Sequence, residues 1–149
     1  MRNIWIYQLE KALQEQESKD LKQVISDFLS SWKSHGADVN SEARILYDRF
    51  IVIRAEEGAT SGCSIDSMNR EIRTMLEKRN LRALESNYIF YRDSEGQIRH
   101  LDFRNMEIAI REGVLNEETV VFDSSVHTHS DFGKWETRLG DSWLSRFYQ

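Results

Sequence analysis

The stretch EARILYDRFIVIR, residues 42–54, decides the fold of the N-terminal half of the chain. It is rich in β-branched and aromatic residues, a composition that favours strands over a helix. Asp48 and Arg49 interrupt the apolar run, so we predict a tight reversal of the chain at these two residues. The stretch therefore predicts two antiparallel strands.

The residues before this hairpin predict a strand and then a helix. Ile4–Tyr7 is short, β-branched and aromatic, as expected of a buried strand. From Ser18 onward, apolar residues recur at steps of three and four and share one helical face: Leu21, Val24, Ile25, Phe28, Leu29 and Trp32. We predict Ser18 as the N-cap of this helix and Gly36 as its stop.

A second helix is predicted after a loop that contains Gly58 and Gly62. Its apolar stripe consists of Ile65, Met68, Ile72, Met75 and Leu76. We predict Ser64 as its N-cap and Asp66 in its first turn. The order strand, helix, strand, strand, helix opens a split βαβ unit of ferredoxin-like type, and Tyr88–Tyr91 is the predicted strand that completes it beside the first.

The C-terminal half predicts a smaller mixed lobe. Tyr88–Tyr91 also forms one arm of a hairpin that turns at residues 93–96 into Ile98–Leu101, followed by a short helix from Asp102 and a strand at Thr119–Phe122. The tail carries five large rings, at Phe132, Trp135, Trp143, Phe147 and Tyr148. Because these rings cover much apolar surface, we expect the tail to be ordered.

The expected fold class is α+β. Residues 1–84 form a ferredoxin-like split βαβ lobe, and residues 85–149 form a β-hairpin, helix and strand lobe closed by the aromatic C-terminal tail. The alternative is one single domain over residues 1–149, which is within the usual length of a domain.

Charge and composition exclude several classes of partner. The net charge of -5 and the pI near 5.4 produce a field that repels phosphate backbones and anionic lipids, so we expect no nucleic-acid partner. No apolar window is long enough for a membrane helix, and the N-terminus does not resemble a signal peptide. The single cysteine, Cys63, excludes an intrachain disulfide and fits a reducing compartment, so we predict a cytoplasmic protein.

The local feature that most suggests chemistry is the stretch Ser61–Asp66, which contains the single cysteine. A thiol at Cys63, just before a helix N-terminus, lies in a positive potential that favours the thiolate, as in thiol-dependent enzymes and redox sensors. The alternative is a small buried hydrophobe beside an ordinary cap. The backbone N–H groups of Gly62, Cys63 and Ser64 could also bind a small anion, although Asp66 already occupies part of the same potential.

Other chemical signatures are weak or absent. His127, His129 and Asp131 are spaced two apart and would share one side of an extended strand, but one loop lacks the supporting shell of a metal site, so we predict no metal. The sequence contains no phosphate-binding loop, dinucleotide fingerprint, nucleophile elbow or zinc-protease motif. We therefore expect no cofactor and no ATPase activity.

Several motifs together resemble a family of uncharacterised small bacterial proteins that often carries the label ABC transporter ATPase. The motifs span nearly the whole chain: residues 5–8, Phe28 and Trp32 before His35-Gly36, residues 47–52, residues 61–66 and residues 141–147. Membership of this family implies no assigned activity.

Residues 88–135 resemble the second type of GYF peptide-binding domain, with a strand, Gly96, a helix, Gly113-Val114-Leu115, the strand Glu118–Phe122 and then Trp135. The family's Gly-Pro-Phe stretch corresponds to Arg99–Phe103 here and lacks both Gly and Pro. This resemblance implies a hairpin-plus-helix lobe with an interaction role.

The function that we predict is non-catalytic binding, because the chain offers aromatic surface but no assembled acid, base and nucleophile. The expected partner is another protein or a second copy of the chain, and the expected contact residues are Trp135, Trp143 and Phe147. The alternative is a thiol-dependent enzyme or redox sensor that uses Cys63.

Overall fold

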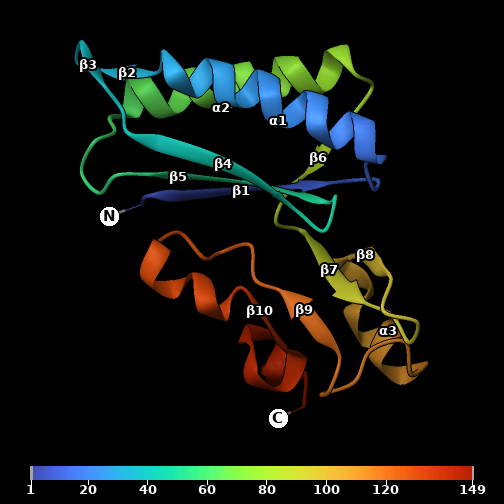
Figure 1. Cartoon of the computed structure of the whole chain (residues 1–149). Coiled ribbons are helices and arrows are strands. Elements are labelled where there is room, and N and C mark those ends of the chain that lie inside the picture. Colours follow the sequence, from blue (N-terminus) through green and yellow to red (C-terminus); the bar gives the residue numbers. More distant parts are fainter. Residues whose placement is uncertain (1, 149) are drawn as a thin grey trace. The chain divides into compact units, whose positions relative to one another are not determined.

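The computed structural model describes residues 2–148 as helices combined with antiparallel sheets, which confirms the α+β class (Figure 1). These residues divide into two compact units. Unit 1 consists of residues 2–84 and His127–His129, and unit 2 consists of Glu85–Val126 and residues 130–148. No helix in the described part of the chain is long and apolar enough to cross a membrane.

The sheet of unit 1 has four antiparallel strands in the order β4-β5-β1-β6, and both helices of the unit lie on one face of it (Figure 1). In chain order the elements are β1 (Ile4–Leu9), α1 (Glu15–Ser30), β2 (Lys33–Ser34), β3 (Ala37–Asp38), β4 (Ser41–Leu46), β5 (Phe50–Ala55), α2 (Gly62–Lys78) and β6 (Ala83–Leu84). β2 and β3 form a separate small hairpin. The ferredoxin-like assignment stays a prediction.

The strand that closes this sheet is not the one we expected. β6 pairs with β1 through Gln8↔Leu84 and Leu9↔Ala83, whereas Tyr88–Arg92 forms β7 in the other sheet, so the prediction for Tyr88–Tyr91 was wrong. Two residues are too few to produce a readable strand pattern in a sequence. β6 pairs with β1 because α2 returns the chain to the edge of the sheet beside β1, and this long-range placement cannot be read from two residues.

The hairpin β4–β5 confirms the prediction for residues 42–54. The reversal lies one residue earlier than expected, at Tyr47 and Asp48, which have positive φ values of 55° and 52°. Arg49 then turns inward: it is 8% exposed, and its Nε and Nη2 atoms donate to the backbone oxygens of Leu9 and Glu10 at 2.8 and 2.7 Å. These hydrogen bonds satisfy carbonyl groups where the chain leaves β1.

Helix α1 starts earlier than predicted. Gln14 is its N-cap, and the Gln14 N–H donates to Glu17 Oε1 at 3.0 Å. Ser18 lies inside the first turn, where its N–H donates to the Gln14 oxygen at 2.9 Å, so Ser18 is not the cap. The helix ends at Ser30, and Gly36 stands with positive φ in the turn of the β2–β3 hairpin instead of at the helix end.

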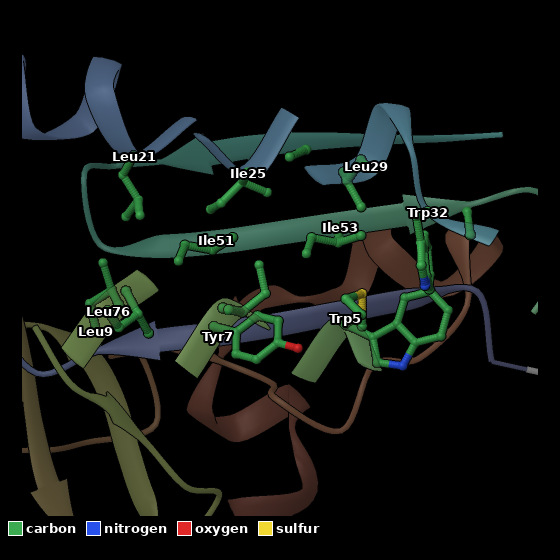
Figure 2. Packing of buried hydrophobic residues seen from close by; sticks show 14 of the residues in the cluster. Trp5, Tyr7, Leu9, Leu21, Ile25, Leu29, Trp32, Ile51, Ile53 and Leu76 are labelled. Atoms are coloured by element: carbon green, nitrogen blue, oxygen red, sulfur yellow. The ribbon is translucent and has the colours of Figure 1, made fainter. Parts of the chain in front are cut away.

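The core of unit 1 forms between the helices and the sheet. Figure 2 shows Leu21, Ile25 and Leu29 of α1 pointing toward Ile51 and Ile53 of β5. Further members come from β1 and α2: Trp5, Tyr7, Leu9, Met68, Ile72 and Leu76. Each fully buried aliphatic side chain of this kind contributes about 1.5–3 kcal/mol. The core thus confirms the predicted apolar faces of both helices.

Unit 2 contains a second antiparallel sheet in the order β10-β9-β7-β8. Its elements are β7 (Tyr88–Arg92), β8 (Ile98–Asp102), the 3₁₀ helix η1 (Phe103–Asn105), α3 (Met106–Arg111), β9 (Val120–Phe122), β10 (Glu136–Arg138) and the 3₁₀ helices η3 (Leu139–Asp141) and η4 (Trp143–Tyr148). The predicted hairpin, short helix and following strand are all present. The 3₁₀ helix η2 (His129–Lys134) precedes β10.

The turn between β7 and β8 is organised by Asp93. Its Oδ1 accepts the backbone N–H groups of Glu95 and Gln97, both at 2.9 Å, and Gly96 takes the positive φ of 80° that the turn requires. Arg99 Nε donates to Asp93 Oδ2 at 3.0 Å, and this hydrogen bond holds the pKa of the Asp93 carboxyl below its ordinary value.

Candidate functional site

The N-terminus of α2 is closed by two serines. Ser61 is the N-cap, since its Oγ accepts the Ser64 N–H at 3.2 Å, and the Ser64 Oγ in return accepts the Ser61 N–H at 2.8 Å. The prediction of Ser64 as N-cap was therefore wrong. A serine three residues after the cap can complete a reciprocal capping box, and this places the first residue of the helix at Gly62.

Cys63 consequently lies inside the first turn of α2 and not just before it. The cysteine is exposed, so the alternative of a buried thiol was wrong. Gly62 faces open space, because a Cβ built at this position meets no atom within 4 Å. Asp66 lies beyond the first turn, which contains no acidic residue, so it does not occupy the helix end as we predicted. Of the three candidate ligand residues, Gly62 and Cys63 are thus exposed at this helix start, whereas Ser64 is buried and its N–H is already bonded to Ser61.

A tryptophan fixes this helix start in place. Trp32, which follows α1, donates its Nε1–H to the Ser64 backbone oxygen at 2.8 Å and is only 3% exposed. Its ring meets Trp5 edge to face at 6.1 Å between ring centroids, and both indoles belong to the core in Figure 2. The apolar stripe alone predicts a packed Trp32 ring and does not reveal this hydrogen bond, although a buried indole N–H generally requires an acceptor.

The histidine-rich loop does not have the geometry of a metal site. His129 and Asp131 lie in η2 and not on an extended strand, so the three side chains do not share one face as the extended-strand alternative required. The His127 backbone oxygen accepts the Asn3 N–H at 2.9 Å, and Asn3 Oδ1 accepts the His129 N–H at 2.9 Å. Within residues 2–148, no group of three or more His, Cys, Asp and Glu side chains could hold a metal ion.

The predicted partner residues of the tail differ in exposure. Trp135 is 3% exposed, stacks on Phe132 at 5.3 Å and contacts Phe122 at 5.0 Å between ring centroids, so its ring lies in the interior. Phe147 is partly buried and meets Phe103 edge to face at 5.8 Å. Trp143, in contrast, is 39% exposed. Of the three residues, Trp143 therefore presents the most accessible ring.

Further apolar side chains are exposed in unit 2. They are Ile108 on α3, Val114 just after α3, and Tyr148, which follows Trp143 in η4. Both α3 and η4 cover the same core of unit 2, to which they contribute Met106, Ala109 and Leu144. We name the exposed set Ile108, Val114, Trp143 and Tyr148 the outer apolar set. Helical periodicity did not reveal it, because α3 is too short to define two faces.

Comparison with protein-family models, curated proteins and solved structures finds no match to this chain. Both family resemblances stay predictions. The assignment of function therefore depends on the two sites described above, the start of α2 and the outer apolar set.

Proposed function

We propose that this chain is a non-catalytic binding protein and that unit 2 binds another protein through the outer apolar set. The observation that carries this proposal is the distribution of exposed large apolar side chains. Four of the five in the described residues lie in unit 2, at exposures between 38% and 49%. Tyr47 of unit 1 is the fifth.

The chemistry of these side chains fits an interface. Tryptophan and tyrosine are enriched among the residues that contribute most to protein–protein affinity, since they combine a large apolar area with a polar edge. Arg146 lies between Trp143 and Tyr148 in the chain, and its guanidinium carbon is 5.6 Å from the ring centroids of both Phe103 and Phe147. Arginine held against aromatic rings is a further common component of binding surfaces.

The sequence supports the same role. The partial resemblance of residues 88–135 to a GYF domain favours peptide or protein binding. We also propose that the protein acts in the cytoplasm, which the single cysteine supports.

A second candidate function is thiol chemistry at Cys63. The observation in its favour is that the thiol is exposed within the first turn of α2, where the helix dipole favours a negative charge. The side-chain hydrogen bonds that close this helix start join Ser61 and Ser64 and not the thiol, which is why binding is the first candidate.

Site-specific photo-crosslinking in the source cells tests the binding proposal. A photoreactive residue would replace Ile108 or Trp143, and the matched control would replace Glu95, which is exposed at the β7–β8 turn of the same unit. We expect the same protein adduct from both test positions and none from position 95. With the photoreactive residue at position 108, Trp143→Ala should reduce the adduct, by about tenfold if the indole contributes on the order of 1–2 kcal/mol. Adducts at the test positions that do not exceed the control would refute the proposal.

A further inference from the structure

The open edge of the unit 1 sheet is formed by β4. Among residues 2–148, strand β4 pairs with β5 on one side only, whereas β5 and β1 each have two neighbours and β6 is just Ala83–Leu84. An edge strand of this length presents unpaired N–H and C=O groups, to which another strand can add.

The hydrogen bonds between β4 and β5 involve every second residue of β4, and this alternation determines which peptide groups of β4 face outward. The Glu56 N–H donates to the Asn40 oxygen at 2.9 Å, and the Arg49 N–H donates to the Leu46 oxygen at 3.0 Å, so the even-numbered residues of this segment bond toward β5. Since bonding alternates in an antiparallel pair, the peptide groups of Ser41, Ala43 and Ile45 point away from the sheet. These three residues form the available edge.

The charges of β4 select one register for pairing with a second copy. Antiparallel pairing centred on Ala43 places Glu42 opposite Arg44 of the second copy, and symmetry repeats this pair. Centring on Glu42 would place two carboxylates opposite each other, and centring on Arg44 would place two guanidinium groups opposite each other. Both alternatives are unfavourable.

The pattern of outward peptide groups agrees with this register. Ala43 would exchange two hydrogen bonds with Ala43 of the second copy, and Ser41 would bond with Ile45. Glu42 and Arg44 would then occupy a non-hydrogen-bonded pair, in which side chains approach most closely. Their present contacts are weak, because Glu42 Oε1 lies 4.0 Å from Arg44 and 3.9 Å from Arg54 and these side chains are about half exposed or more.

The surface beside β4 provides room for a second strand. A hollow of about 360 Å³ lies between the end of α1 and the start of β4, lined by Ser26, Leu29, Ser30, Val39 and residues 40–43. In the register centred on Ala43, Ile45 of the second copy stands opposite Ser41, on the helix side of the sheet. The hollow therefore leaves space beside Ser41 for the strand of the second copy.

We propose that two copies of the chain associate through β4, antiparallel and centred on Ala43, so that the two unit 1 sheets become one continuous sheet. The occupant of this edge is thus a second copy of the chain. The proposal concerns unit 1 and does not use the outer apolar set, so it can fail or succeed independently of the proposed function.

Sedimentation equilibrium over a micromolar concentration series tests the proposal. We expect the wild-type mass to rise from 17.6 kDa to twice that value. Glu42→Arg or Arg44→Glu creates two like-charge pairs at the interface and should raise the dimer dissociation constant about tenfold or more. The combined variant Glu42→Arg/Arg44→Glu restores opposite charges and should dimerise nearly as well as wild type.

Two controls separate this interface from a general charge effect. Glu71→Arg alters the net charge as Glu42→Arg does but lies on the exposed side of α2, so it should leave dimerisation unchanged. Hydrogen exchange of the wild-type chain should show the amides of Ser41, Ala43 and Ile45 becoming protected as concentration rises. A wild-type protein that stays monomeric, or a charge swap that fails to recover dimerisation lost in the single variants, would overturn the proposal.

Discussion

The capping box of α2 gives a sharp test of the local structure around Cys63. Ser61→Ala removes the hydroxyl that accepts the Ser64 N–H at 3.2 Å and should destabilise the protein by about 1 kcal/mol, within a range of roughly 0.5–2. Ser64→Ala removes the acceptor of the Ser61 N–H at 2.8 Å, and we expect a cost of similar size. Because the two bonds form one reciprocal unit, the double variant should cost less than the sum.

Urea unfolding followed by tryptophan fluorescence measures these differences, since Trp32 is bonded to Ser64. A loss of about 1 kcal/mol corresponds to a midpoint shift of about 0.3–1 M urea. Ser67→Ala is the matched control, because Ser67 lies within α2 and alanine is the better helix former. A neutral Ser61→Ala combined with a destabilising Ser64→Ala would refute the capping box and restore Ser64 as the cap.

Two further predictions concern Cys63 and Asp93. The Cys63 thiol is exposed, so an alkylating reagent should label it in the folded protein at a rate comparable to that in denaturant, measured by mass spectrometry. Labelling that requires denaturant would remove the thiol chemistry candidate. The folded-state pKa of Asp93 is lowered, chiefly by its hydrogen bond to Arg99. This carboxylate therefore stabilises the fold at pH values above its unfolded pKa of about 4. The stabilisation disappears as the pH falls through the lower folded pKa. Wild type should therefore exceed Asp93→Asn in thermal stability at pH 7 and lose the advantage below about pH 4, whereas a constant difference down to pH 2 would contradict the assignment.

Much of the fold could be predicted from patterns that repeat along the chain. The apolar stripes of α1 and α2 and the strand-forming run at residues 42–54 each contain enough residues to define a periodicity. The hairpin β7–β8 could be predicted because Asp93 and Gly96 specify a turn by local chemistry.

The candidate sites were harder to predict, because they depend on contacts between distant residues. Serine is a good N-cap at either position 61 or position 64. The choice between them follows from the hydrogen bonds that the two serines exchange and from the hydrogen bond of Trp32, 32 residues earlier in the chain, to the Ser64 backbone oxygen. The inward position of Arg49 likewise depends on carbonyl groups at the end of β1, about 40 residues earlier.

The sequence by itself therefore determined the α+β class, the amphipathic helices and the local hairpins, since these follow from periodicity and turn chemistry over short windows. Only the tertiary structure decided that β6 closes the first sheet, that Trp135 is buried while Trp143 is exposed, and that β4 is left at an open edge. The physical reason is that strand neighbours and burial result from long-range packing, in which residues with the same local preference reach different environments.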